Sequence, residues 1–124
     1  MQPQGHFHIV SAVSVVSVAL AAIAALAAHR LASYRALVLA MAFLGMSGLF
    51  AVHGLATPGF LLGREYGAVI GFAARMSVVV AAALLAASTV EPPARCAAFL
   101  VRHRTALLVG WGVCLLAFAG SALA

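Results

Sequence analysis

Residues 9–28 of this 124-residue chain read IVSAVSVVSVALAAIAALAA, an unbroken apolar run that carries no charge. A helix needs about 20 mostly apolar residues to cross the hydrocarbon core of a bilayer, and this run meets that length. Similar runs follow at about residues 36–57, 66–88 and 105–124. Their continuous, alanine-rich composition favours helices over the alternating strands of a membrane barrel. We therefore expect an all-α fold, an integral membrane four-helix bundle in which residues 1–124 form a single transmembrane domain.

The composition of the whole chain also indicates that most of its surface faces lipid. Apolar residues make up 66% of the chain, charged residues only 7%, and the mean hydropathy is +1.18. A soluble domain is about half apolar and about a quarter charged, and a chain this short has too little interior to hide so much apolar surface. The composition therefore excludes a soluble monomer, a disordered segment and a nucleic-acid-binding module. We expect the lipid bilayer to be a partner of the chain.

Basic residues are distributed unevenly between the turns. Five follow the first and third apolar runs, namely Arg30, Arg35, Arg95, Arg102 and Arg104. On the other side only Arg64 is present, next to Glu65. Because basic residues in short loops are retained in the cytoplasm, the asymmetry predicts that both termini lie outside. Arginine without lysine, together with abundant alanine, is typical of a GC-rich bacterial genome, so we expect a multi-pass protein of a bacterial inner membrane.

The stretch from Ala94 to Arg104 differs from the four runs. It follows the break at Glu91-Pro92-Pro93 and places Cys96 and Phe99 at helical spacing among arginines. This pattern predicts a short amphipathic helix that lies in the membrane interface before the fourth span begins.

Small residues recur in each span, where they would let helix backbones approach closely in lipid. The candidates are Ser11, Ser14 and Ser17 in the first span, Gly45, Ser47 and Gly48 in the second, Gly67 and Gly71 in the third, and Gly110, Gly112, Gly120 and Ser121 in the fourth. They predict that every span contributes a seam to a compact bundle. The alternative interpretation is that glycine and alanine are simply common in membrane helices.

Arg75 lies deep in the third span, on the same helix face as Gly67 and Gly71. Placing an arginine near mid-bilayer costs roughly 2.5 to 3.5 kcal/mol on insertion scales, and no acidic residue occurs in any span to pair with it. One interpretation is a bundle-facing cation that binds a carboxylate, a quinone oxygen, a haem propionate or a lipid phosphate. The other is a structural arginine that bonds helix carbonyls or extends along its own helix to the interface.

Histidines gather near the outer side of the expected bundle. His53 lies about one turn inside the second span, and His6 and His8 precede the first. Imidazole is a common ligand of copper, zinc and haem iron, so His53, His8 and His6 form a candidate metal site. Tyr66, at the start of the third span, could complete a ligand site with His53. The competing interpretation is that these histidines anchor the interface.

The remaining histidines, His29 and His103, lie on the inner side among arginines. With a pair of His8 and His53 they would give the ligand layout of a two-haem membrane cytochrome. Histidines that bind haem usually lie deeper in the bundle, so the sequence favours solvated interface residues at both positions.

Catalytic patterns are missing from the sequence. It contains no Cys-x-x-Cys, no His-x-x-x-His, no phosphate-binding glycine loop and no carboxylate inside a span. We therefore expect a protein that is not an enzyme.

Residues 50–59, FAVHGLATPG, resemble a segment of the multi-span membrane modules found at the front of bacterial signalling proteins. Those proteins carry histidine kinase, nucleotide cyclase or diguanylate cyclase output domains. The resemblance covers about ten residues and the placement of histidine before the first span. It implies a sensor or anchor module with His53 as a ligand contact.

Three functions are compatible with these patterns. The first is a non-enzymatic membrane module for sensing or anchoring, with an outward-facing histidine site. The second is a small accessory subunit of a larger respiratory or photosynthetic membrane complex, in which Arg75 meets another subunit. The third is an electron-transfer protein that binds haem or copper. Other membrane subunits or a second copy of the chain are the expected protein partners.

Overall fold

The computed structural model describes residues 3–56 and 67–124, with side chains from His8 onward. The described residues form five helices and confirm the all-α fold class. These are α1 (Pro3–Leu31), α2 (Tyr34–Leu55), α3 (Gly67–Thr89), α4 (Ala94–Arg102) and α5 (Arg104–Leu123).

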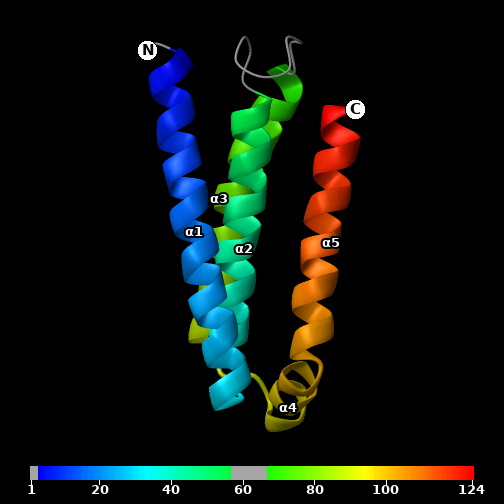
Figure 1. The fold of residues 1–124 in the computed structure, drawn as a ribbon. Coiled ribbons are helices and arrows are strands. Elements are labelled where there is room, and N and C mark those ends of the chain that lie inside the picture. Colours follow the sequence, from blue (N-terminus) through cyan, green and yellow to red (C-terminus); the bar gives the residue numbers. More distant parts are fainter. Residues whose placement is uncertain (1–2, 57–66) are drawn as a thin grey trace.

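Four stretches of these helices are long and apolar enough to cross a membrane, namely His8–Leu31, Tyr34–Leu55, Gly67–Thr89 and Arg104–Leu123. Their bounds lie within about three residues of those expected from hydropathy, at the accuracy usual for helix ends. The expected ends at 57 and 66 lie outside the described residues. The spans alternate in direction, so both ends of the chain lie at the end of the bundle opposite α4 (Figure 1). Which side of the membrane they face remains a prediction.

The turn between α1 and α2 is held by local bonds. Ala32 adopts a positive φ of 47°, which reverses the chain within two residues of the end of α1. The Ser33 Oγ then accepts a hydrogen bond from the Ala36 backbone N–H at 3.3 Å, which caps the first turn of α2. At the same end of the bundle, Arg35 forms an ion pair of 2.7 Å with Glu91 and so connects α2 to the chain after α3.

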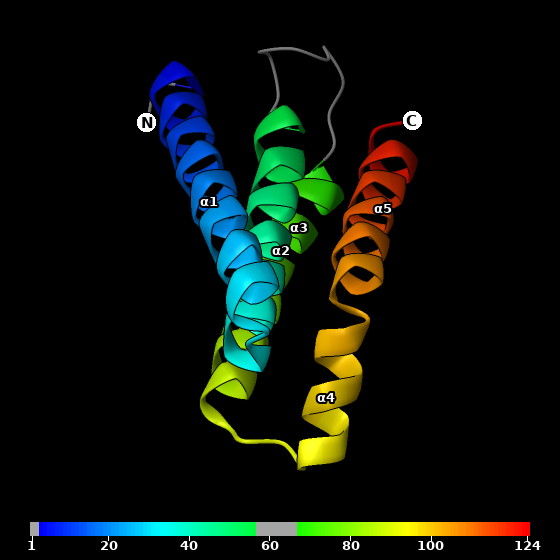
Figure 2. The same ribbon diagram turned by 60° about the horizontal axis from the view of Figure 1, so that its bottom comes forward.

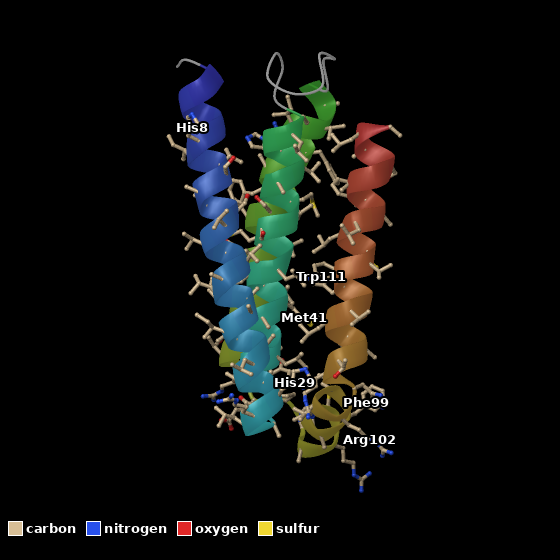
Figure 3. The ribbon with its side chains drawn as sticks, in the orientation of Figure 1. His8, His29, Met41, Phe99, Arg102 and Trp111 are labelled. Carbon is tan, nitrogen blue, oxygen red and sulfur yellow. The ribbon has the colours of Figure 1, made fainter. Side chains whose placement is uncertain are left out.

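α2 is the central helix, and α1, α3 and α5 pack around it (Figures 1 and 2). Its contact with α5 depends on two glycines. A Cβ added at Gly45 would lie 3.1 Å from the Trp111 ring, and one added at Gly48 would lie 3.1 Å from Leu115. The Trp111 indole also donates a hydrogen bond of 3.0 Å to the Met41 carbonyl, and Figure 3 shows the two residues facing each other across α2 and α5. Large side chains of α5 thus fill notches left by glycines of α2.

The contact of α1 with α2 is made by small and polar residues. The Ser47 hydroxyl donates a hydrogen bond of 3.1 Å to the Ser14 carbonyl, and Ser17 is buried one turn further along α1. Near the C-terminal end of α2, a Cβ added at Gly54 would lie 3.0 Å from Val10. The seams expected on the first two spans are therefore present.

The seams expected on the third and fourth spans are wrong within this chain. A Cβ added at Gly67, Gly71, Gly110, Gly112 or Gly120 would meet nothing within 4 Å. α5 contacts the bundle through Trp111, Leu115 and Phe118, which are one or two turns apart, so its glycines point elsewhere.

Candidate functional site

α3 carries two stripes of small residues on opposite sides. Ala73, Ser77 and Ala81 are spaced four apart and are the buried residues of this helix, packed toward α2. Gly71 and Arg75 are also four apart, and each lies two residues from a buried position. Because two residues correspond to about 200° of helix rotation, burial of one stripe leaves the other exposed.

Arg75 therefore lies on the outer face of α3, and the expectation of a bundle-facing arginine is wrong. Its side chain is exposed in a shallow, otherwise apolar hollow formed by Ala74, Val78 and Val79. Within the described part of the chain, its guanidinium has no hydrogen bond and no ion pair. Turning α3 the other way would place this charge against α2, where the described residues offer no counter-charge, in place of the alanines and serine that pack there now.

The position of Arg75 along the helix is well inside the span. It follows Gly67 by eight residues, about 12 Å at 1.5 Å per residue, in a helix about 35 Å long. Ionisable residues inside spans almost always face a bundle interior or a water-filled cavity. In this chain the arginine faces outward, and among the described residues no acidic side chain pairs with it.

The surface around Arg75 suits close approach by another helix. Gly67 and Gly71 precede it at intervals of four residues and are open to the surroundings. Such a Gly-x-x-x-Gly pair lets two backbones come together and strengthens packing between membrane helices. We call the surface formed by Gly67, Gly71, Ala74, Arg75, Val78 and Val79 the α3 outer face.

His53 has a different environment from Arg75. Its ring is buried, and its Nδ1 lies 3.1 Å from the Ile70 carbonyl oxygen of α3. A carbonyl only accepts, so this contact places the imidazole proton on Nδ1. The Phe50 ring lies edge-on to it, with ring centres 6.4 Å apart. His53 thus joins α2 to α3 near the C-terminal end of α2, and Tyr66, proposed as its companion, lies outside the described residues.

The other candidate metal ligands give no further support to a metal centre. His8 is exposed on α1, as Figure 3 shows near the N-terminal end. The backbone of His6 belongs to α1, but its side chain is not among those described. Among the described residues no three His, Cys, Asp or Glu side chains are close enough together to hold a metal ion. A site made by His6, His8 and His53 stays a prediction.

His29 and His103, the pair at the end of the bundle where α4 lies, make separate contacts. The Arg104 Nε–H donates a hydrogen bond of 3.0 Å to His29 Nδ1. The His103 ring packs on Phe99 with ring centres 4.6 Å apart. Both histidines are exposed at the end of the bundle where α4 lies, as the sequence favoured.

Sequence reasoning missed the stripe that orients α3. Ala73, Ser77 and Ala81 have the same four-residue spacing as the glycine pair and were visible in the sequence. The predicted packing face was instead the one that carries Gly67 and Gly71, which lies on the opposite side of the helix. The available signal was the arginine itself, because a span with one charge and no counter-charge in the chain should turn that charge away from its own neighbours.

The described helices form an all-α bundle with the architecture of a multi-pass membrane protein. Comparisons with protein-family models, with curated proteins and with solved structures give no match for this chain.

Proposed function

We propose that this protein is a non-enzymatic membrane subunit that binds laterally to another integral membrane protein through the α3 outer face. The observation that carries the proposal is the outward-facing Arg75 inside a span, with no partner among the described residues. In the assembled complex, a carboxylate on a helix of the other protein pairs with the Arg75 guanidinium. Arginine binds carboxylates through two parallel hydrogen bonds, which suits this position.

A second copy of the chain is a poorer partner for Arg75. The chain has only two acidic residues, Glu65 and Glu91, and both lie outside the four spans. Glu91 is also paired with Arg35 near the other end of α3. A symmetric dimer through the α3 outer face would bring two guanidinium groups together without a carboxylate at their depth, and like charges repel most strongly where water is absent.

The sensing function built on His53 is less well supported by the geometry. The imidazole is buried and engaged with the Ile70 carbonyl. This contact is sufficient to explain a histidine near the C-terminal end of α2, because it connects α2 to α3 at the end of the bundle where both chain termini lie (Figure 1). We therefore assign His53 a structural role in the subunit.

The proposal is tested with a synthetic partner helix. The probe is a polyleucine peptide of about 20 residues with one central Glu and a dansyl group, compared with the same peptide carrying Gln. Trp111, the single tryptophan of the chain, serves as the energy-transfer donor in phosphatidylcholine vesicles. Polar contacts between membrane helices are worth about 0.6 to 2 kcal/mol, so we expect the Glu peptide to bind roughly 3- to 30-fold more tightly.

Two variants make the test specific. Arg75→Gln should abolish the preference for the Glu peptide. Arg30 is an exposed arginine near the C-terminal end of α1, and Arg30→Gln should leave the preference unchanged. Gly71→Leu should weaken binding of the Glu peptide by blocking backbone approach, and Gly110→Leu on α5 should not. Equal binding of the Glu and Gln peptides to the unmodified protein would mean that Arg75 extends to the interface and takes no carboxylate partner.

A further inference from the structure

α4 lies across the ends of the spans. Figure 1 shows it nearly end-on while the four long helices run up the page, and Figure 2 shows its full length after the view is turned. Pro93 sets its start, since the Pro93 carbonyl accepts hydrogen bonds from the Cys96 and Ala97 backbones at 2.8 and 3.0 Å. The helix ends at Arg102, and His103 alone separates it from α5, which begins at Arg104. A short helix in this orientation lies in the plane of the lipid headgroups if the long helices span the membrane.

The two faces of α4 differ in what they touch. Ala97, Leu100 and Val101 are half-buried toward the bundle, whereas Arg95, Phe99 and Arg102 are exposed and share a face at intervals of four and three residues. No residue of α4 is fully buried. The outward face thus combines two cations with one aromatic ring, which is 60% exposed and packs against the neighbouring His103 ring.

The other arginines at this end of the bundle are already engaged. Arg35 pairs with Glu91, and Arg104 donates both to His29 and, at 2.9 Å, to the Val101 carbonyl. Three guanidinium groups at this end of the bundle have no ion pair or hydrogen bond within residues 3–56 and 67–124.

These three are Arg30, Arg95 and Arg102. Arg102 points away from the helices beyond the end of the bundle (Figure 3). Because the only acidic residue described at this end is already paired with Arg35, no described carboxylate is available to the α4 arginines.

We propose that the outward face of α4 binds anionic phospholipid headgroups of the surrounding bilayer. Arg95 and Arg102 contact phosphate oxygens, which guanidinium groups recognise through paired hydrogen bonds. Phe99 lies between them at the level where aromatic rings prefer to sit, at the boundary of headgroups and acyl chains. Lipid is the occupant because α4 lies across the span ends, where headgroups surround it on its exposed sides. This function is independent of the α3 outer face and of any protein partner.

The chain contains its own reporter for this contact. Cys96 is exposed on α4, and Cys114, the other cysteine, is on α5. In a Cys114→Ala background, an environment-sensitive fluorophore on Cys96 is compared in vesicles of phosphatidylcholine alone and of phosphatidylcholine with phosphatidylglycerol. We expect a blue shift and weaker quenching by aqueous iodide in the anionic vesicles. Soluble glycerol phosphate added to neutral vesicles should produce neither change.

The double variant Arg95→Gln/Arg102→Gln should remove the difference between the two vesicles, whereas Arg30→Gln on α1 should preserve it. A second measurement needs no label: the lipids that co-purify with the detergent-solubilised protein are quantified by mass spectrometry. An arginine near an anionic surface is worth about a fivefold preference, so each substitution should lower the ratio of phosphatidylglycerol to phosphatidylcholine by about that factor. The proposal is overturned if the unmodified protein shows no preference, if the double variant retains it, or if soluble phosphate reproduces the shift.

Discussion

Two glycine pairs of this protein have similar spacing and opposite surroundings. Gly45 and Gly48 of α2 are filled from outside by Trp111 and Leu115, at distances of 3.1 Å from where a Cβ would be. Gly67 and Gly71 of α3 meet nothing within 4 Å. Small residues show that a helix can be approached closely. They do not show whether the approaching helix belongs to the same chain.

The difference between the two pairs follows from what else each helix carries. No charged residue lies near Gly45 and Gly48 in α2, so this part of the helix can be surrounded on all sides by other helices. α3 has Arg75 in line with its glycines and an alternative small stripe, Ala73 to Ala81, on the far side. The stripe from Ala73 to Ala81 packs within the chain, and the glycine pair stays on the opposite side of the helix with Arg75.

The largest difference between the two pairs is expected when one glycine of each is replaced by a large residue. Gly45→Leu must displace the Trp111 ring and Val80, and overpacking of this kind costs about 1–3 kcal/mol. Gly71→Leu extends into open space and should change the stability of the isolated protein by less than about 0.5 kcal/mol. Unfolding in mixed micelles, followed by helical circular dichroism, measures both. Equal destabilisation by the two substitutions would show that the α3 pair is also buried within the chain.

A smaller effect is expected from Trp111→Phe. The substitution removes the hydrogen bond to the Met41 carbonyl and part of the ring that fills the Gly45 notch. We expect a loss of about 1–2 kcal/mol in the same unfolding measurement. The control is Val113→Ala, an exposed position on the same helix. If the control costs as much as Trp111→Phe, the notch does not hold α5.

The smallest effect concerns the polar contact between α1 and α2. Ser47→Ala removes the hydrogen bond to the Ser14 carbonyl, and such bonds between membrane helices average about 0.6 kcal/mol. Ser88→Ala removes only a bond to the Leu85 carbonyl of its own helix, so it should leave the association of helices unchanged. Precise unfolding curves of both variants should therefore differ in midpoint, and coincident curves would argue against a role for Ser47 in this seam.

Most of the fold could be predicted from hydropathy, because the length and apolar character of a span are properties of one segment. The helix within Ala94–Arg104 could also be predicted, since its amphipathic spacing is local. The rotation of each helix could not, because it depends on which faces compete for α2. Arg75 was recognised as the unusual charge, but the sequence left open whether it faces the bundle or extends along its own helix, and the structure places it on the outer side of α3. His53 was recognised as a residue inside a span, whereas its contact with the Ile70 carbonyl depends on the packing of two helices.

The most direct test of the α3 outer face is photo-crosslinking in native membranes. A photoreactive amino acid is placed at Val78 on this face or at Val113 on α5, positions that are 62% and 58% exposed. We expect the Val78 probe to crosslink a different membrane protein, through a peptide from a transmembrane segment that contains Asp or Glu. Arg75→Gln should remove this product, and the Val113 probe should not give it. If the Val78 probe reacts only with lipid or only with a second copy of this chain, the assignment of the α3 outer face as a binding surface for another protein is wrong.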